Sequence, residues 1–499
     1  MLFFPTEGAV NYPIISPAEG GGNNFFFYAA DIRRQKYEKQ TGITMKKDRE
    51  IFKRALLLAV PMMIQNGITN AVGLIDNIMV GSLGTEAITA VSIVGQLIFV
   101  FNLGIFGGLS GPGIFGAQYY GQKNTEGFRS TVRIKHLISL VVLVVGLLAF
   151  IFGGEWLIGL YLKGGSEEID PVLTMELAKS YLNVMLWGLP PFVITQIYAG
   201  SLRETGDSLK PMIAGIMSVV VDITFNWLLI YGNLGFPKLE VRGAAIATVI
   251  ARFAEMLTVV IWAFAARKKK HEFLLGLYKT LLVPKETAKK MLAKTLPIFA
   301  NEFLWAGGIA VLTQCYSTRG LDIVPGLNIS NALCNLLNVV FIAMGNAVGI
   351  LIGQTLGAKR YDEAKTEAFR LMWFTGAVSF LLTAILVSIS GVFPNLYDTS
   401  ESVRSTATGF IIITALFFPV QGFLNALYFT LRSGGKTLVT FLFDSVFSWV
   451  ITVPTAFLLC NFTALPILAV YAIIQAVDLI KVSVGYVLIK KGVWISNIV

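Results

Sequence analysis

Several charged residues lie inside long apolar stretches of this sequence, where a charge is costly and marks a candidate functional site. An ionisable side chain within an apolar span usually faces an ion or substrate pathway rather than lipid. Acidic side chains are the commonest among these positions, which favours chemistry with cations or protons. The eight positions are Asp76, Asp222, Arg252, Glu255, Glu302, Asp444, Asp478 and Lys481.

Asp76 is the most isolated of these acids, since no basic residue lies within one helical turn of it. A carboxyl group without a counter-charge in an apolar surrounding is suited to binding a proton. With neutral oxygens nearby it can hold Na⁺ instead, because hard cations prefer oxygen ligands. The structural alternative is a hydrogen bond between packed helices. Pro61 precedes Asp76 by 15 residues, and we expect it to kink the first apolar helix.

Asp222 and Asn226 are spaced i and i+4, so both side chains lie on one face of a helix. Two oxygen-bearing side chains one turn apart form half of an ion site. Thr248, in the next apolar run, can add a hydroxyl oxygen. The structural alternative for these residues is a polar seam between helices.

Two further pairs of charges are spaced i and i+3, namely Arg252 with Glu255 and Asp478 with Lys481. Opposite charges at this spacing neutralise one another on a helix surface. We therefore interpret both pairs as structural ion pairs rather than as ligands.

The remaining acids are candidates for contact with a substrate. Glu302 follows Asn301 early in the seventh apolar run, and Asp444 lies in the eleventh. A carboxylate within an apolar span can attract a cationic ligand. We predict that these three residues line a substrate cavity.

The composition predicts that much of the protein surface lies in lipid. Hydrophobic residues make up 55% of the 499 residues and charged residues only 14%, whereas soluble domains carry about 25% charged residues. Twelve apolar runs lie between residues 51 and 489, and each can span a bilayer as a helix. Runs of this length are not barrel strands, which alternate over about ten residues. The predicted fold class is an all-α membrane protein with twelve transmembrane helices.

Lysine and arginine are distributed unevenly among the segments that flank these runs. Alternate segments hold 28 of them and the others hold six. Basic residues accumulate on the cytoplasmic side, so we expect a multi-pass protein of the cytoplasmic (inner) membrane with both termini in the cytoplasm. Residues 1–44 precede a basic start at Met45, and we expect a disordered extension or a mis-assigned start there.

The two halves of the sequence resemble one another. At a shift of 236 residues, 61–123 aligns with 297–359 without a gap. Because each half has an even number of helices, the repeat is parallel, and such proteins place the substrate site between the halves. We predict an N-lobe of six helices at 45–266, a cytoplasmic linker at 267–290 and a C-lobe of six helices at 291–499.

Motifs for catalysis and for ATP binding are incomplete. Residues 111–116 match G-x-G-x-x-G but lie within an apolar run, and the segment before Lys436 lacks the first glycine of a phosphate loop. The three cysteines and two histidines match no metal or disulfide pattern. We expect no enzyme activity, no cofactor and no metal beyond Na⁺ at the Asp76 site, so transport must use an ion gradient or be passive.

Five segments together are typical of a known family. The segments are Pro61 to Gly81, Gly116 to Gly121, Leu202 to Gly206, Asp222 to Gly232 and Val241 to Thr248. With these segments the chain resembles the multidrug and toxic compound extrusion (MATE) transporters, and most of all their DNA-damage-inducible-F-like prokaryotic branch. The similarity covers about residues 45–492.

The resemblance implies two six-helix lobes around a central cavity and the exchange of organic cations for Na⁺ or H⁺. It also implies a coupling-ion site made by an acid on helix one, an Asn and an Asp one turn apart on helix five, and a Thr on helix six. The matching residues here are Asp76, Asp222, Asn226 and Thr248.

Two departures from the family pattern bear on the coupling ion. The order of Asp222 and Asn226 is the reverse of that in the branch, which leaves Na⁺ and H⁺ both open. Some relatives carry an acid on helix ten, where this chain has the neutral Gln421 and Asn425. That difference favours coupling in the first lobe.

The predicted function is therefore a secondary antiporter that exports amphipathic, cationic compounds by alternating access. Its partners are the lipid bilayer and small organic substrates, with no nucleic acid, and we expect a monomer. One rival is a flippase of lipid-linked precursors, which would need a basic cavity. A rival from another class is a membrane-embedded enzyme, which would need a constellation of His, Cys or metal ligands.

Overall fold

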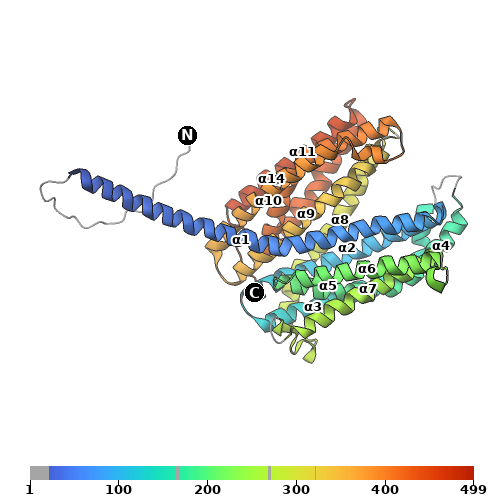
Figure 1. Cartoon of the computed structure of the whole chain (residues 1–499), viewed down its shortest axis with the longest axis horizontal. Helices are drawn as coiled ribbons and strands as arrows, with labels where there is room; N and C mark the ends of the chain where they lie inside the picture. The colour runs from blue at the N-terminus through green and yellow to red at the C-terminus, as the bar shows by residue number, and fades with distance from the viewer. Residues whose placement is uncertain (1–21, 163–168, 268–270, 321) are drawn as a thin grey trace. The chain divides into compact units, whose positions relative to one another are not determined.

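The computed structural model describes residues 22–162, 169–267, 271–320 and 322–499, and its regular elements in those ranges are helices (Figure 1). Twelve of them are long and apolar enough to cross a membrane. The predicted all-α membrane fold with twelve transmembrane helices is thereby confirmed.

The first described residues belong to a helix. Residues 22–44 form the beginning of α1. The stretch 31–40 is rich in Arg, Lys, Gln and Glu, which have high helix propensity. Residues 1–21 lie outside the described residues. The chain up to Ile51 is a unit of its own, and the rest of the chain, from Phe52 onward, forms a second unit that contains the spans except for the first three residues of the first span, Arg49–Gly81.

The helices of the first half supply six of the spans, because α4 and α5 are joined by a single 3₁₀ turn and count as one. Their bounds are α1 Gly22–Gly81, α2 Thr85–Gly121, α3 Thr125–Leu162, α4 Pro171–Met185, α5 Leu189–Glu204, α6 Leu209–Tyr231 and α7 Glu240–Ala265.

The second half supplies the other six spans. Its helices are α8 Lys285–Ser317, α9 Ile323–Gly357, α10 Tyr361–Ile389, α11 Glu401–Ser433, α12 Thr437–Phe441, α13 Val453–Phe462 and α14 Ile467–Lys490. Between α12 and α13, the segments Leu442–Val446 and Ser448–Thr452 are π-helical, and the whole stretch counts as one span. Such π turns often occur at functional sites, and this one contains Asp444.

Local sequence signals set several helix ends. The side chain of Asp170 accepts hydrogen bonds from the backbone amides of Val172 (2.8 Å) and Leu173 (3.3 Å), and Pro171 follows as the first residue of α4. These residue types are the preferred ones at a helix start. Gly232 ends α6 with φ of 75°, a left-handed conformation that glycine adopts without strain.

The helices pack into two bundles. Helices α2 to α7 pack on one another, and α8 to α14 do the same. Helix α2 also packs on α8 and α9 and so joins the bundles. Glycines allow this close approach, since a Cβ atom on Gly107 would lie 3.0 Å from the Phe299 Cα and one on Gly111 would overlap Thr295.

The contact between α2 and α9 is reciprocal. A Cβ atom on Gly121 would overlap the backbone carbonyl of Gln354, and one on Gly357 would overlap that of Gln118. The two glycines, like the two glutamines, are 236 residues apart, which is the shift of the internal repeat. The same two glutamines donate hydrogen bonds to the backbone carbonyls of Glu204 and Ser433, which directly follow Arg203 and Arg432. We call this end of the molecule the basic end.

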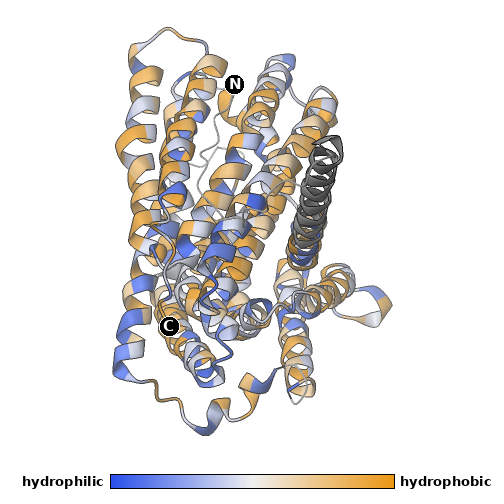
Figure 2. Cartoon of the chain, turned by 90° about the vertical axis from the view of Figure 1, so that its left-hand side faces the viewer, coloured by the Kyte–Doolittle hydropathy of each residue, from blue (hydrophilic) through white to orange (hydrophobic). Residues whose placement is uncertain are grey.

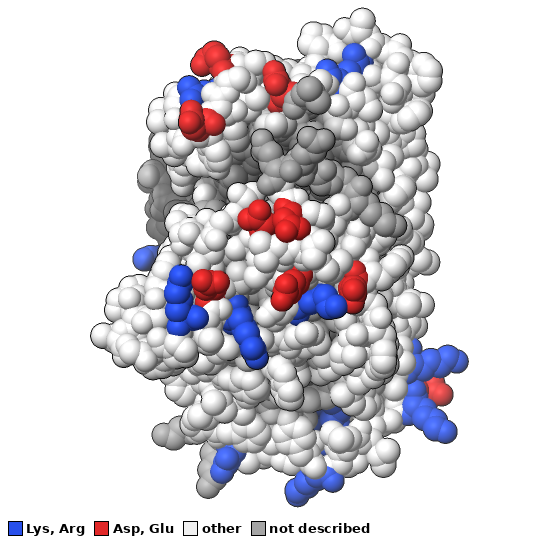
Figure 3. Space-filling view, turned by 90° about the vertical axis from the view of Figure 1, so that its right-hand side faces the viewer, with Lys and Arg blue, Asp and Glu red and all other residues white. Residues whose placement is uncertain are grey.

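Most of the helices consist largely of apolar residues, as Figure 2 shows by hydropathy. In the view of Figure 3, uncharged residues dominate and the charged ones form small groups. One long helix, α3, exposes a run of large apolar side chains: Leu140, Val141, Val144, Val145, Leu148, Ile151 and Phe152. An apolar surface of this extent needs lipid around it.

Candidate functional site

The first bundle brings together three of the predicted ion ligands. The Nδ2 of Asn226 donates to Oδ1 of Asp76 at 2.8 Å and lies 3.4 Å from Oδ2 of Asp222. The two carboxyl groups therefore lie close together, on either side of one amide nitrogen. Asp222 and Asn226 are buried, and Asp76 is half-buried. The two polar side chains share one face of α6, and in the structure this face meets the acid of α1.

Thr248 of α7 and Tyr181 of α4 complete this cluster. Both residues lie close enough to Asp222 to interact with it electrostatically. Tyr181 is a ligand candidate that sequence reasoning missed, because a tyrosine in an apolar run carries no local signal of such a role. We call these five residues the acidic cluster.

The acidic cluster has the donor set of a hard-cation site. It offers two carboxyl groups, an amide and two hydroxyls, all of them oxygen-bearing, which suits Na⁺. Oδ1 of Asp222 and Oδ1 of Asn226 are buried without a hydrogen-bond partner among the described residues. Across those same residues, no group of three or more His, Cys, Asp and Glu forms a site for a transition metal.

Arg252 and Glu255 are close but do not pair directly in the described structure. The guanidinium of Arg252 donates to the backbone carbonyl of Gly188 at 3.2 Å and lies over the Phe192 ring. The carboxylate of Glu255 accepts from Nε2 of Gln65 at 3.5 Å. The side chain of Arg252 thus contacts the 3₁₀ turn between α4 and α5 and forms no ion pair with Glu255 in the described structure.

The second bundle places its charged residues in an ion-paired network. Lys481 Nζ lies 3.2 Å from Asp478 Oδ1 and 3.7 Å from Asp444 Oδ1. Asn301 Nδ2 donates to Asp444 Oδ2 at 3.1 Å, and Gln421 Nε2 donates to Asp478 Oδ2 at 2.8 Å. The i, i+3 pair on α14 is therefore formed.

The two bundles differ at equivalent positions of the repeat. Asp444 is the counterpart of Asp222, because Asp222-x-x-Phe225-x-Trp227 matches Asp444-x-x-Phe447-x-Trp449 at a smaller shift of the repeat. Asp444 has a lysine within ion-pair distance. Asp222 has no cationic side chain within 4.0 Å in the described part of the chain, because Arg252 points toward Gly188. Of these two equivalent acids, the one that lacks a direct counter-charge is thus Asp222, in the first bundle.

Glu302 lies at the junction of the bundles. A Cβ atom on Gly107 of α2 would lie 3.2 Å from its Cγ, so the side chain packs against α2. Arg432 and Asp444 interact with it electrostatically at longer range. Pro61, the predicted kink, lies within α1, and the helix continues through it.

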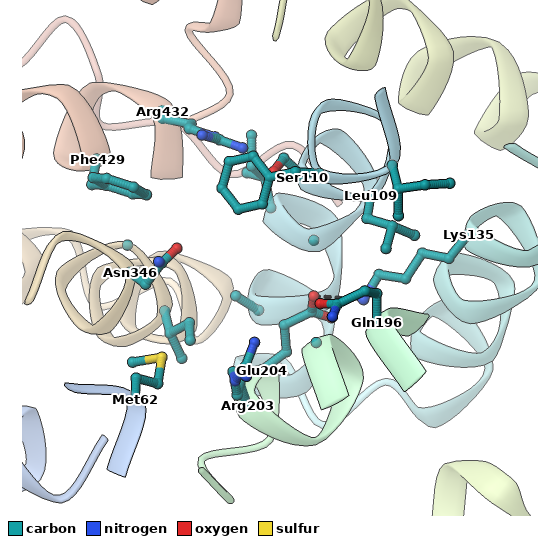
Figure 4. Close-up of a pocket in the computed structure, with 18 of the residues that line it drawn as sticks. Met62, Leu109, Ser110, Lys135, Gln196, Arg203, Glu204, Asn346, Phe429 and Arg432 are labelled. Atoms are coloured by element: carbon teal, nitrogen blue, oxygen red, sulfur yellow. Dashed lines mark hydrogen bonds and ion pairs between the residues drawn. The ribbon is translucent and has the colours of Figure 1, made fainter. Parts of the chain in front are cut away.

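A cavity of about 330 Å³ lies between the bundles, toward the basic end (Figure 4). Helices α2 and α5 line one side and α9 and α11 the other. The charged residues on its wall are Lys135, Arg203, Glu204 and Arg432. Glu302, Asn301 and Asp444 are not among the residues that line it.

Beyond this cavity, hydrogen bonds tie the bundles together. Gln354 Nε2 donates to the backbone carbonyl of Glu204 at 2.8 Å, and Gln118 Nε2 donates to that of Ser433 at 2.9 Å. The segment 492–499 adds to this closure. The backbone amide of Ile498 donates to Oε1 of Gln118 at 2.9 Å.

The fold and the site define a membrane transporter of two bundles with a cavity between them, and comparison with known proteins agrees. The MatE family model matches the chain twice, over residues 61–228 and 297–458. The two matches begin 236 residues apart, as the internal repeat does. The chain belongs to the MatE family of multidrug efflux transporters.

Curated relatives cover nearly the whole chain. It is 26% identical over 471 residues to the probable multidrug resistance protein YoeA of Bacillus subtilis, covering 92% of this chain and 98% of that protein. It is 25% identical over 463 residues to the probable multidrug resistance protein NorM of Thermotoga maritima, covering 89% of this chain and 93% of that protein.

Solved structures share the fold. A mutant of the Vibrio cholerae MATE transporter VcmN superposes with a TM-score of 0.79 at 15% identity, covering 91% of this chain and 99% of that one. A MATE transporter in complex with MaL6 gives a TM-score of 0.76 at 21% identity, covering 88% and 95%.

Proposed function

We propose that this protein is an ion-coupled antiporter that exports amphipathic compounds, and that the acidic cluster binds the coupling ion. The observation behind this proposal is that the carboxyl groups of Asp76 and Asp222 lie 2.8 Å and 3.4 Å from the same amide nitrogen, Nδ2 of Asn226. Two carboxylates this close repel one another unless a proton or a cation lies between them. A site that requires a bound cation, placed in a transporter, supports ion coupling.

The chemistry of the cluster accommodates either coupling ion. Na⁺ would take its ligands from the two carboxylates, from Oδ1 of Asn226 and from the hydroxyls of Thr248 and Tyr181. A proton would need only the two carboxyl groups, one donating to the other. The reversed order of Asp222 and Asn226 relative to the family branch keeps one carboxylate on α6 but moves it by a turn.

The contacts at the basic end support a particular state in the transport cycle. We propose that the basic end faces the cytoplasm, in line with the positive-inside rule, and that both termini lie there. The bonds made by Gln118 and Gln354 close that side. Binding of the coupling ion from outside would then favour reopening toward the cytoplasm, because a ligand shifts the equilibrium toward the state that binds it better.

The test compares Asp76→Asn and Asp222→Asn with the matched control Asp444→Asn, the repeat counterpart of Asp222. In vesicles with separate Na⁺ and H⁺ gradients, we expect wild type and the control to export a panel of fluorescent amphipaths of either charge. We expect both cluster variants to lose at least tenfold in rate. The gradient that drives export identifies the ion.

A second readout does not depend on knowing the substrate. Spin labels at the exposed positions 123 and 362 report the distance between the bundles at the basic end. We expect this distance to change with Na⁺ or pH in wild type and not in Asp76→Asn. If Asp76→Asn exports and responds to ions as wild type does, the acidic cluster is a packing feature and the coupling proposal is wrong.

The charge of the substrate needs a separate argument. The predicted preference for organic cations depended on Glu302, Asn301 and Asp444. Asn301 and Asp444 bond to each other, and none of the three lines the cavity between the bundles. The residues that do line it favour the opposite sign.

A further inference from the structure

Two arginines from equivalent positions of the repeat line the cavity between the bundles. Arg203 is the last residue but one of α5 and Arg432 the last but one of α11, and both follow a leucine in matching segments. Figure 4 shows the two side chains on opposite sides of the same cavity. With Lys135, the wall holds three cationic side chains and one acidic side chain, Glu204.

The lysine and the acid neutralise each other. Lys135 Nζ lies 2.5 Å from Oε1 of Glu204 and donates to Oγ of Ser201 at 3.1 Å. Both charged side chains are buried, at 1% and 7% exposure. The excess charge of the cavity is therefore that of the two guanidinium groups.

Arg432 is buried without a direct counter-ion. Its exposure is 6%, and its guanidinium lies over the rings of Tyr428 and Phe429 at 5.9 and 5.6 Å. No carboxylate of the described residues comes within 4.0 Å of it, and Glu302 acts on it only at longer range. Aromatic faces attract a cation, but they do not replace the paired hydrogen bonds of a carboxylate.

Arg203, on the other side of the cavity, also lacks a direct counter-ion among the described residues. Its Nη2 donates to Oε1 of Gln65, a neutral acceptor, at 2.8 Å. Its Nε is buried and has no acceptor among the described residues. Glu255 interacts with it electrostatically but accepts its hydrogen bond from Gln65.

Charges that are buried without a partner are costly, and proteins retain them where a ligand supplies the partner. Guanidinium groups recognise carboxylate and phosphate groups through paired hydrogen bonds. We propose that the cavity binds the anionic headgroup, a phosphate or a carboxylate, of an amphipathic molecule between Arg203 and Arg432. This inference rests on the proposed transport function and specifies the substrate class.

The rest of the wall fits such a molecule. Gln196, Asn346 and Ser110 can add neutral hydrogen bonds to a headgroup. The apolar part would contact Ile105, Phe106, Leu109, Ile114, Phe192 and Ile350. A volume of about 330 Å³ is at the lower end for small-molecule pockets, so it holds the headgroup and the first part of a chain.

This site also couples binding to movement. When the basic end is open, both guanidinium groups face water, and closing it removes them from water. An anion between them stabilises the closed state more than the open one, which is the condition for a ligand to drive a conformational change. The anion would therefore be loaded from the cytoplasm and would promote closure behind it.

The test uses four probes on the purified full-length protein in nanodiscs: decyl phosphate, decanoate, decyltrimethylammonium and inorganic phosphate. Binding is measured by isothermal titration below the critical micelle concentrations, with empty nanodiscs as a blank. We compare wild type with Arg203→Gln, Arg432→Gln and Arg432→Lys. The control is Lys179→Gln, which removes an exposed charge far from the cavity that pairs with Glu155.

We expect the two decyl anions to bind at least tenfold more tightly than the decyl cation. Each glutamine variant should lose about tenfold or more of anion affinity, Arg432→Lys should lose less, and Lys179→Gln should lose none. Tighter binding of the cation, or anion binding unchanged in both glutamine variants, would overturn the proposal. Equal binding of inorganic phosphate and decyl phosphate would contradict an amphipathic ligand.

The binding experiment tests the anion site independently of the proposal that the acidic cluster binds the coupling ion. Binding is measured without an ion gradient, and Asp76→Asn should bind decyl phosphate if its fold and cavity are intact. Failure of the anion site leaves ion-dependent movement of the labels at 123 and 362 unaffected. Failure of coupling leaves the anion affinity unaffected.

Discussion

The reciprocal contact between α2 and α9 predicts that Gly121→Ala opens the basic end. The added Cβ would overlap the backbone carbonyl of Gln354. Backbone atoms of a packed helix cannot turn aside as a flexible side chain does, so the two helix ends must separate. The contact exists only where the bundles are closed on each other, and the closed state therefore bears the cost.

The magnitude follows from the cost of overpacking. One methyl group forced into a packed contact costs about 1 to 3 kcal/mol. Such a free energy changes the ratio of two states by about 5- to 150-fold. We expect the open population at the basic end to rise by a factor in this range. Gly357→Ala should act alike, since its Cβ would overlap the Gln118 carbonyl.

The assay is the distribution of distances between spin labels at positions 123 and 362, on either side of this contact. The native cysteines Cys315, Cys334 and Cys460 are buried, which favours selective labelling. The control is Gly95→Ala on the same helix, where a Cβ atom would have no neighbour within 4 Å. We expect the control to match wild type.

An unchanged distance distribution in both Gly121→Ala and Gly357→Ala would refute this reasoning. It would show that the α2–α9 contact does not hold the bundles closed. A similar shift in Gly95→Ala would instead mean that any added methyl on α2 disturbs the protein, and the specific role of the contact would be wrong.

Three further predictions concern other parts of the structure. Ending the chain after Lys491 removes the hydrogen bonds that Ser496, Asn497 and Ile498 make with the ends of α2 and α9, so we expect the same label pair to show a larger open population. Lys135→Met leaves Glu204 buried without its partner, a change that costs about 3 to 5 kcal/mol, and the midpoint of thermal unfolding should fall; the double variant with Glu204→Gln should recover much of the loss. Tyr181→Phe removes a hydroxyl from the acidic cluster, and we expect weaker ion dependence of export with little change in folding; equal ion dependence would exclude that hydroxyl as a ligand.

Much of the fold was predictable from the sequence, because a transmembrane helix is a local property. About 20 apolar residues are long enough to span a bilayer, so the twelve spans follow from the apolar runs alone. Helical periodicity is equally local, and it places Asp222 and Asn226 on one face without knowledge of any contact. The internal repeat indicates where equivalent positions lie, such as Gly121 and Gly357.

The tertiary structure decided which helix faces meet, and with that the identity of the sites. It brought Asp76 to Asn226, 150 positions along the chain, and added Tyr181, which had no local signal. It turned Arg252 away from Glu255 toward the carbonyl of Gly188.

The tertiary structure also decided the charge of the cavity. Arg203 and Arg432 lie next to the last residues of α5 and α11, and Lys135 lies inside α3. For all three, the sequence indicates only basic flanks facing water. Packing of the two bundles placed them on the wall of one cavity. Periodicity and hydropathy depend on neighbours along the chain, whereas side chains from distant helices meet according to volumes and contacts that no single segment contains.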